Sequence, residues 1–379
     1  MGVMYDGIVI HYAEIFLKGP SVKRKFEQIL ICRLQEKLKW KERLDLKISL
    51  KDHTILIKGP VDLTLVEYLA KTFGVRYALP VVFCKSSINS ICEASSRLSA
   101  LAQNHNSLSF RVKPKKEKLL SLSSKTIEYE IASFFQHWPL DLNNPSCIIY
   151  AVIKKQYSYI GFHRVNGPGG LPYGSSGRVL VLISRGIDST VAAWLMAMRG
   201  CELSLLHFGE EPVDKIKELL EQYSGKPIKV FLIPHKILLQ KFQDREAEKH
   251  LCIFCKTAMY IAGEIIANNI KAQALVTGEN LGQVASQTLD NMVSMTSMVD
   301  AVILRPLIAF NKEEIIDLAK EIGSYLLYNN PSCPFVPKHP YTAMKKEKLH
   351  HYIHSSVFKQ CISEWQASWN FQATHNKKA

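Results

Sequence analysis

The sequence predicts an α/β protein in which small mixed units precede a larger domain built on a parallel sheet. After residue 178, apolar strand-like runs alternate with helical runs, which is typical of parallel strands covered by helices on both faces. Before residue 165, β-rich runs and amphipathic stretches are mixed as in small α+β units. At 379 residues the chain is too long for one ordinary core, so we expect several domains.

The first 80 residues predict a small α+β domain. Apolar runs of period two indicate strands, and apolar residues spaced three or four apart indicate amphipathic helices. Gly74 closes the second helix, as glycine does at many helix C-termini. The expected order is a strand at 7–19, a helix at 22–38, a strand at 53–59 and a helix at 61–74.

Residues 81–166 predict a second α/β segment by the same criteria. We expect a strand at 108–114, a helix at 123–138, and a strand pair at 147–155 and 157–165 joined near Gln156. The stretch from 165 to 177, VNGPGGLPYGSSG, is rich in Gly, Pro and Ser and predicts a boundary between domains. The third domain then spans 167–350, and residues 351–379 are expected to form a tail.

A regular series of apolar strands and helices predicts the parallel sheet of the third domain. Each strand-like run is followed by a helical run, and a long helical stretch passes through Cys252. The series comprises residues 178–184, 189–200, 201–208, 213–223, 227–234, 273–278, 284–295, 301–307 and 311–323.

The charge of the chain favours a polyanionic partner. Lys and Arg number 48 against 34 Asp and Glu, a formal net charge of +14, and neutralised phosphates release condensed counterions. A basic protein without such a partner would have the same composition. Five of the eight residues of RVKPKKEK are cationic and follow Phe110 directly, which fits either a phosphate-binding strand edge or a solvated loop. The candidate RNA contacts are Arg111, Lys113, Lys115 and Lys116.

Targeting signals and membrane spans are not expected. The N-terminal residues lack the basic region and cleavage site of a signal peptide, and no run approaches the roughly 18 apolar residues of a membrane span. Nine cysteines then favour a reducing compartment, where thiols act as metal ligands or catalysts more often than as cross-links. We expect a cytoplasmic protein.

A candidate phosphate-binding loop follows the apolar strand that ends at Ile183. The residues SRGIDST, 184–190, lead into a helix, so that backbone N–H groups and the helix N-terminus can face an anion. An ordinary turn between a strand and a helix could have the same composition.

This loop resembles the SGGxDS motif of the PP-loop ATP pyrophosphatases, and the chain is more closely similar to the tRNA 4-thiouridine synthetases, or tRNA sulfurtransferases. The similarity covers residues from about 5 to about 345. It is carried by GPGGLPYGSSGRVLVLISRGIDS (167–189) and TGENLGQVASQTLDNM (277–292), and by YDGIVIHYAEIFLKG (5–19), FGVRYALPV (73–81) and RPLIAFNKEEIIDLAKEIGSY (305–325).

The resemblance implies a ferredoxin-like N-terminal domain, a THUMP RNA-binding domain over 81–166, and a PP-loop domain of the adenine nucleotide alpha hydrolase-like fold. It also implies an enzyme that transfers sulfur to uridine 8 of tRNA. ATP adenylates the uracil O4 and releases pyrophosphate, and sulfur then displaces AMP. Because a carbonyl oxygen is a poor leaving group, adenylation has a clear chemical purpose.

Positions matching the family motifs imply an ATP site with Mg²⁺. The pyrophosphate loop would contain Ser184, Gly186, Asp188 and Ser189, with Asp188 and Ser189 in catalytic roles and Asp188 handling Mg²⁺ or the leaving phosphates. The other implied ATP contacts are Leu182, Ile183, His207, Phe208, Lys256, Gly278 and Gln287. Of these, Leu182, Ile183 and Phe208 could instead be core residues that touch the nucleotide through their backbone.

Arg185 departs from the family motif, which has glycine at this position. Its side chain occupies space that glycine leaves for close phosphate approach. Arg185 either points outward and adds a phosphate contact, or blocks the site. The second outcome would leave a non-catalytic tRNA-binding protein, the alternative to the enzyme.

The cysteines provide a second candidate site. Cys252 and Cys255 form a C-x-x-C at an expected helix start, and Cys333 lies in NNPSCPFVP. Three thiolates suit a cluster better than a four-ligand zinc site, although a redox pair or two buried thiols would have the same spacing. No ligand function is expected for His350, His351 and His354.

The resemblance implies an iron–sulfur cluster on Cys252, Cys255 and Cys333, as in a branch of the family that lacks a rhodanese domain. Only about 30 residues follow the third domain, too few for another domain. A [4Fe-4S] cluster with three cysteine ligands would leave one iron free to hold sulfide; alternatively, Cys333 carries a persulfide. The expected partners are tRNA and a sulfur donor, either sulfide or a cysteine desulfurase, with a homodimer left open.

Overall fold

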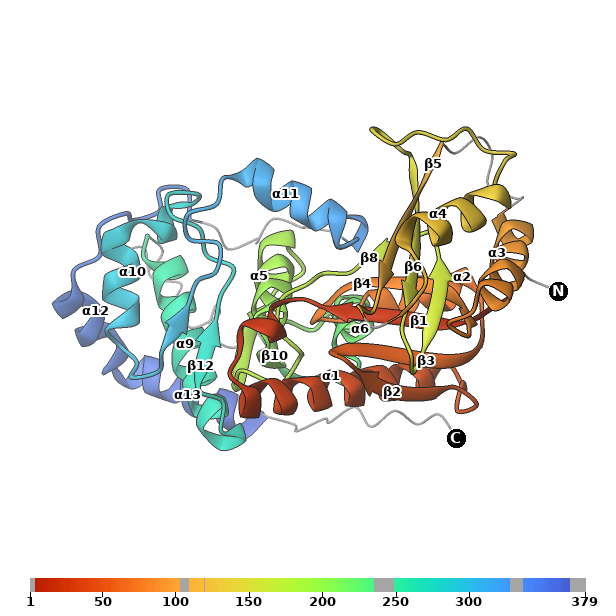
Figure 1. Ribbon diagram of the computed structural model, residues 1–379. Helices are drawn as coiled ribbons and strands as arrows, with labels where there is room; N and C mark the ends of the chain where they lie inside the picture. Colours follow the sequence, from red (N-terminus) through yellow and green to blue (C-terminus); the bar gives the residue numbers. More distant parts are fainter. Residues whose placement is uncertain (1–3, 103–108, 119, 235–248, 328–336, 369–379) are drawn as a thin grey trace. The chain divides into compact units, whose positions relative to one another are not determined.

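The computed structural model describes residues 4–102, 109–118, 120–234, 249–327 and 337–368. The chain forms two compact units, residues 1–172 and 173–379, which are treated separately below. The division falls within the Gly-, Pro- and Ser-rich segment predicted as a boundary. Figure 1 gives the labels of the helices and strands.

The first half of unit 1 has the βαββαβ order of a ferredoxin-like fold. Its four strands pair antiparallel in the order β2-β3-β1-β4, so that the first strand lies between the third and the fourth. The elements are β1 (Tyr5–Tyr12), the short 3-10 helix η1 (Glu14–Leu17), α1 (Pro20–Trp40), β2 (Lys47–Lys51), β3 (Thr54–Val61), α2 (Leu63–Ala70) and β4 (Val75–Cys84). The predicted ferredoxin-like arrangement is confirmed.

The second half of unit 1 continues the same sheet through β4. The first part of β4 pairs with β1, and Val82, Phe83 and Cys84 pair with β7, so the sheet goes on in the order β4-β7-β6-β5. The predicted division between residues 80 and 81 therefore falls inside one strand. The elements are α3 (Ile88–Ala102), β5 (Phe110–Lys116), α4 (Ser124–Ser133), β6 (Cys147–Ile153), β7 (Ser158–Gly161) and β8 (Val165–Asn166), which pairs with β4.

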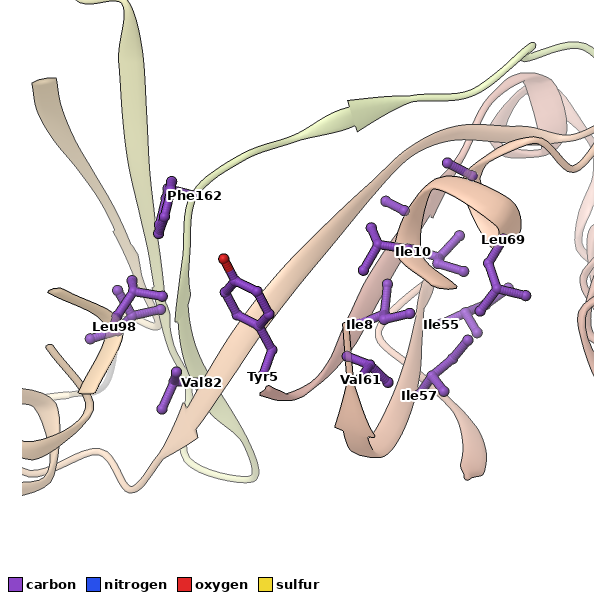
Figure 2. Packing of buried hydrophobic residues seen from close by; sticks show 14 of the residues in the cluster. Tyr5, Ile8, Ile10, Ile55, Ile57, Val61, Leu69, Val82, Leu98 and Phe162 are labelled. Carbon is purple, nitrogen blue, oxygen red and sulfur yellow. The ribbon is translucent and has the colours of Figure 1, made fainter. Parts of the chain in front are cut away.

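The core of unit 1 lies on the helix-covered face of this sheet. Figure 2 shows Ile8 and Ile10 of β1 beside Ile55 and Ile57 of β3, with Leu69 of α2 packed near them. All five side chains are fully buried. Because alternate residues of a strand point to opposite faces, Val9 of β1 and Leu56 of β3 lie on the other face, where they are buried in a second, smaller hydrophobic cluster with residues of β4 and β7.

Unit 2 is built on a parallel sheet, as predicted. The order is β11-β10-β9-β12-β13, and every pairing is parallel. The chain passes from β9 to β10 and β11 on one side and then to β12 and β13 on the other, so the carboxyl end of β9 is a topological switch point, where ligands bind in open α/β sheets. The strands are β9 (Arg178–Ile183), β10 (Glu202–Phe208), β11 (Lys229–Ile233), β12 (Ala274–Val276) and β13 (Ile303–Leu304).

Helices complete the core of unit 2. They are α5 (Ile187–Met198), α6 (Asp214–Ser224), α9 (Leu251–Ile270), α10 (Leu289–Thr296), α11 (Lys312–Glu321), α12 (Lys346–Ile353) and α13 (Ser356–Ser368), with the 3-10 turns η2 (Ala285–Gln287) and η3 (Tyr325–Leu327). Within the described ranges, α9 is the one helix long and apolar enough to cross a membrane, but most of its apolar stretch is buried, as in a core helix. Helix α13 lies in the predicted tail, yet its Phe358, Cys361 and Trp365 belong to the same core.

Candidate nucleotide and sulfur-transfer site

The loop between β9 and α5 is held by its serines. The backbone N–H of Ser184 donates to Oγ of Ser189 at 2.9 Å, and the two hydroxyls lie 2.9 Å apart. Gly186 is the N-cap of α5 and offers no side-chain cap, so the first N–H groups of this 12-residue helix lack intrahelical partners. This arrangement, a loop ending in a helix N-terminus at the switch point of the sheet, favours an anion.

Gly278 lets the segment after β12 touch this loop. A Cβ atom at position 278 would lie 2.5 Å from the backbone nitrogen of Ser189 and 2.7 Å from the carbonyl carbon of Asp188. No side chain fits between them, so glycine is required for the close approach of two backbones. The structure thus gives Gly278 a packing role beside the loop, while its predicted contact with ATP stays a prediction.

Asp188, in the first turn of α5, receives two hydrogen bonds from distant parts of the chain. Nζ of Lys312 donates to its Oδ1 at 2.6 Å, and Nε2 of Gln283 donates to its Oδ2 at 3.1 Å. Lys312 is the first residue of α11, whose start is fixed by a capping box of Asn311 and Glu314. Both oxygens of the carboxylate therefore have partners, and a metal ion at Asp188 would have to share or displace them.

A buried carboxylate lies next to Gly278. The Glu279 side chain is only 6 % exposed and accepts from Lys256 Nζ at 3.1 Å and from Arg305 Nε at 2.9 Å. The Tyr260 hydroxyl and Oγ1 of Thr277 donate to Oε2, the oxygen that Arg305 also contacts, whereas Lys256 contacts Oε1. Burial alone would raise the pKa of Glu279, but the Lys256 ammonium and the other donors outweigh it, and the pKa lies below its usual value. Glu279 is therefore an ionised anchor that fixes Lys256, one of the predicted ATP contacts.

His207 is a neutral imidazole at the end of β10. The ring is buried, and its Nδ1 lies 2.9 Å from the carbonyl oxygen of Ile183 at the end of β9. Burial lowers the pKa of His207 below its usual value, against the opposing effect of this hydrogen bond. Because a carbonyl oxygen only accepts, Nδ1 carries the proton and Nε2 is left as the acceptor of the neutral ring.

The remaining predicted ATP contacts lie at the same edge of the sheet, but most are apolar core residues. Leu182 faces α9 at Gly263, Ile183 is buried, and the Phe208 ring lies 5.4 Å from that of Trp365. Gln287 differs: it is 8 % exposed, and its Oε1 has no hydrogen-bond partner among the described residues. Because buried polar atoms are nearly always paired, this oxygen fits a missing donor such as an amino group of a ligand.

Arg185 points away from the loop. Its Nη1 forms an ion pair with Oε2 of Glu211, which follows β10. The sequence left two orientations of the Arg185 side chain open, and the ion pair with Glu211 corresponds to the outward one.

The two described cysteines of the candidate cluster lie near the start of α9, as expected. Cys252 is half-buried and Cys255 is buried. Cys333 lies outside the described residues, so the three-cysteine arrangement stays a prediction. Over the described ranges, no three His, Cys, Asp or Glu side chains are placed to share a metal ion.

The basic run forms β5, an edge strand of the unit 1 sheet. Phe110 and Val112 point into the core, whereas Arg111, Lys113 and Lys115 alternate with them and are exposed. Lys116 is half-buried and donates through Nζ to the carbonyl oxygen of Leu120 at 3.0 Å. The strand thus presents three predicted RNA contacts on one face and separates the fourth from them.

Lys113 and Lys115 line a groove of about 460 Å³ on unit 1. Its walls include the aromatic rings of Tyr77, Tyr150 and Tyr159. The cations suit phosphates, and the half-buried rings of Tyr77 and Tyr150 could stack on a base, whereas Tyr159 is buried. The groove gives the basic strand a shaped surface, which a solvated loop would lack.

Several residues near the loop between β9 and α5 were not singled out from the sequence. Glu279, Gln283, Arg305 and Lys312 lie inside the motifs that carry the family resemblance, and only their geometry reveals a role. The others are Tyr260 and Glu211. Their partners are 19 to 124 positions away, a separation for which the sequence has no signal.

A parallel sheet with an anion-binding loop at its switch point defines a nucleotide-binding α/β protein. Residues 174–358 match the family described as "Thiamine biosynthesis protein (ThiI)", and residues 7–78 match "ThiI ferredoxin-like domain". A "Probable tRNA sulfurtransferase" of Methanocaldococcus jannaschii is 33 % identical over 363 residues, 90 % of this chain and 95 % of that protein. One of Geobacillus sp. is 31 % identical over 92 % of this chain and 90 % of the relative.

Among solved structures, one described as "a 4-thiouridine synthetase - RNA complex with bound ATP" is similar with a TM-score of 0.86 and 28 % identity, covering 97 % of this chain and 98 % of the other. PH1313 from Pyrococcus horikoshii shares the fold, with a TM-score of 0.66 at 20 % identity over 84 % of this chain and 99 % of the other. The chain belongs to the ThiI family of tRNA sulfurtransferases. It is a sulfurtransferase enzyme.

The close approach at Gly278 leads to a testable prediction. Gly278→Ala forces the backbone of Ser189 away and should destabilise the protein by about 1–3 kcal/mol, the usual range for an overpacked site. Urea denaturation followed by circular dichroism measures this. Gly19→Ala is the control because a Cβ at position 19 meets nothing within 4 Å; as a helix N-cap it should lose less than about 1 kcal/mol. Equal stability losses would contradict the packing role of Gly278.

Proposed function

We propose that this chain transfers sulfur to uridine 8 of tRNA in an ATP-dependent reaction and so produces 4-thiouridine. The observation that carries the proposal is the similarity, over 97 % of the chain, to a 4-thiouridine synthetase described with RNA and ATP. The loop at the switch point of the unit 2 sheet supports it, because a nucleotide needs such an anion site. The nine cysteines of the chain fit a reducing, cytoplasmic location, where thiols act as metal ligands or catalysts more often than as cross-links.

The residues of the loop fit the phosphates of ATP. The unpaired N–H groups at the start of α5 and the Ser184 and Ser189 hydroxyls would receive the pyrophosphate part. Gln287 offers its unpartnered Oε1 to a donor such as the adenine amino group. Lys256, fixed by Glu279, would add a cation at the phosphates.

The proposed chemistry has two displacements. The uracil O4 attacks the α-phosphorus of ATP, and the bond from that phosphorus to pyrophosphate breaks. Sulfide then attacks C4, and the C4–O4 bond breaks to release AMP. If a persulfide attacks instead, its outer sulfur bonds to C4 as AMP leaves, and a second cysteine thiol must then displace 4-thiouridine from the S–S bond, leaving a disulfide between the two cysteines. The loop would stabilise the negative charge that collects on the leaving pyrophosphate, the electrostatic contribution that dominates phosphoryl transfer.

Asp188 would hold Mg²⁺ beside the leaving phosphates. Its carboxylate is the acidic group of the loop, and carboxylate oxygens are preferred Mg²⁺ ligands. Lys312 now lies 2.6 Å from Oδ1 and would be freed to contact phosphate if the ion takes its place. One cation would thus be exchanged for another at Asp188.

tRNA would lie along β5 and the groove of unit 1. Arg111, Lys113 and Lys115 project from one face of an edge strand, as contacts to a phosphate backbone require. Lys116 donates to the carbonyl oxygen of Leu120 and Arg111 to that of Leu142, so both would contribute less than Lys113 and Lys115.

Cys252, Cys255 and Cys333 would hold a [4Fe-4S] cluster, which would supply an iron able to bind sulfide. The two described thiols are one helical turn apart, a spacing that suits two ligands of one cluster. A persulfide on Cys333 is the competing route for sulfur.

The non-catalytic alternative depended on obstruction by Arg185. The ion pair of Arg185 with Glu211 supports a side chain that leaves the loop unobstructed, and so supports the enzyme.

Loss of the Asp188 carboxylate should abolish activity. Asp188→Asn removes a metal ligand and the charge opposite Lys312, and we expect at least a 100-fold fall in AMP release with tRNA, about 2.7 kcal/mol in the barrier. Asp317→Asn, on the exposed face of α11, is the matched control and should keep the parent rate. A thiolation assay with parent protein, ATP, Mg²⁺, tRNA and sulfide would refute the function if no 4-thiouridine formed.

Charge reversal on β5 should weaken tRNA binding. For Lys113→Glu with Lys115→Glu, we expect a lower affinity and a salt dependence reduced by about one unit of slope for each lost phosphate contact. Lys47→Glu with Lys51→Glu places the same charges on β2, at the opposite edge of the sheet, and is the control. Filter binding at several salt concentrations measures both. An unchanged slope in the β5 variant would exclude this strand as an RNA contact.

Iron and acid-labile sulfide should accompany the anaerobically purified protein. Cys252→Ala, Cys255→Ala and Cys333→Ala should each lose both, because each would remove one ligand of the cluster. Cys32→Ala, at an exposed thiol outside the candidate site, is the control and should retain them. A parent protein without iron, but with a Cys333 persulfide detected by mass spectrometry, would assign sulfur transfer to that cysteine.

A further inference from the structure

Arg185 stands in a phosphate-binding loop at a position where the family motif SGGxDS has glycine. Two observations bear on what it does there. The backbone at Arg185 does not adopt the positive φ that would demand glycine, so a side chain is tolerated without strain. The guanidinium is paired with Glu211 rather than folded over the loop.

The ion pair lies at the rim of an open cavity. β9 and β10 are parallel neighbours, with Ile183 opposite His207, so the segments after them lie at the same edge of the sheet. Arg185 and Glu211 line a cavity of about 750 Å³ together with Asp214 and Lys215 of α6. The guanidinium therefore has room to change its partner.

The ion pair with Glu211 holds the Arg185 guanidinium only weakly. Its side chain is 66 % exposed and that of Arg185 is 28 % exposed, and ion pairs in contact with water contribute little. A polyphosphate carries more negative charge than one carboxylate and accepts two parallel hydrogen bonds from a guanidinium. In competition for Arg185, a pyrophosphate group in the loop has the advantage.

We propose that Arg185 is a ligand of the β- and γ-phosphates of ATP, held aside by Glu211 until the nucleotide binds. This inference rests on the proposed function, because it requires ATP in the loop. It makes Arg185 an added phosphate contact in place of an obstruction. Glu211 then acts as a competitor whose removal makes the arginine available.

The test is isothermal titration calorimetry of the full chain with three probes: ATP, inorganic pyrophosphate and AMP. Arg185→Gly restores the motif residue and should weaken ATP and pyrophosphate binding about tenfold, the effect of 1.4 kcal/mol. AMP lacks the β- and γ-phosphates and should bind as before. Glu211→Gln keeps the shape of the side chain but removes its charge, and should tighten ATP and pyrophosphate binding severalfold.

Lys215→Gln is the matched control, since it removes a cation from the same cavity rim without altering the loop. It should leave all three affinities unchanged. Arg185→Lys retains a charge and should fall between the parent and Arg185→Gly, with circular dichroism used to verify that each variant is folded.

The outcomes separate this inference from the proposed function. If the parent binds ATP and pyrophosphate, but Arg185→Gly binds them equally well or more tightly, Arg185 is no phosphate ligand and the inference is overturned. The same holds if Lys215→Gln weakens binding as much as Arg185→Gly, since the effect would then be one of general charge. If the parent binds neither ATP nor pyrophosphate, the proposed function itself fails and the inference with it.

Discussion

The candidate nucleotide site, at the carboxyl edge of the unit 2 sheet, depends on the ion pairs of the buried carboxylate of Glu279. It joins three elements that are far apart in the sequence: Lys256 comes from α9, Arg305 follows β13, and Glu279 itself follows β12. A buried carboxylate without its partners would be strongly destabilising, so the folded protein requires the three segments to be in contact. The two cations exceed the single carboxylate by one charge, so this cluster is net positive, which suits an anionic ligand beside it.

The regular elements could be predicted where a single period dominates. The parallel sheet of unit 2 follows from alternating apolar strands and helices, and β5 follows from the alternation of Phe110 and Val112 with cations. Strand β4 and helix α3 were not predicted. β4 is apolar with no strict alternation and contains Pro80, a residue that usually argues against a strand within a sheet. α3 is rich in serine, which competes for backbone hydrogen bonds and weakens the helical signal.

The loop and its location could also be inferred from the sequence, but its pairings could not. Asp188 and Lys312 are 124 positions apart, and Asp188 and Gln283 are 95 apart. Such contacts depend on how strands and helices are ordered in the sheet, and no local pattern encodes that order. The direction of the Arg185 side chain is a similar case, since it depends on where Glu211 emerges after β10.

The shared strand β4 joins the two halves of unit 1 into one continuous sheet. Its sheet is hydrogen-bonded without interruption from β2 to β5, a path of seven strands. The sheet is bent, because His11 of β1 and Lys113 and Lys115 of β5 line the same groove. A flexible connection would let the basic edge swivel about the ferredoxin-like half, whereas a common strand forbids it, because any such rotation would tear backbone hydrogen bonds. An RNA bound at β5 would therefore contact a strand whose position is fixed relative to the ferredoxin-like half of unit 1.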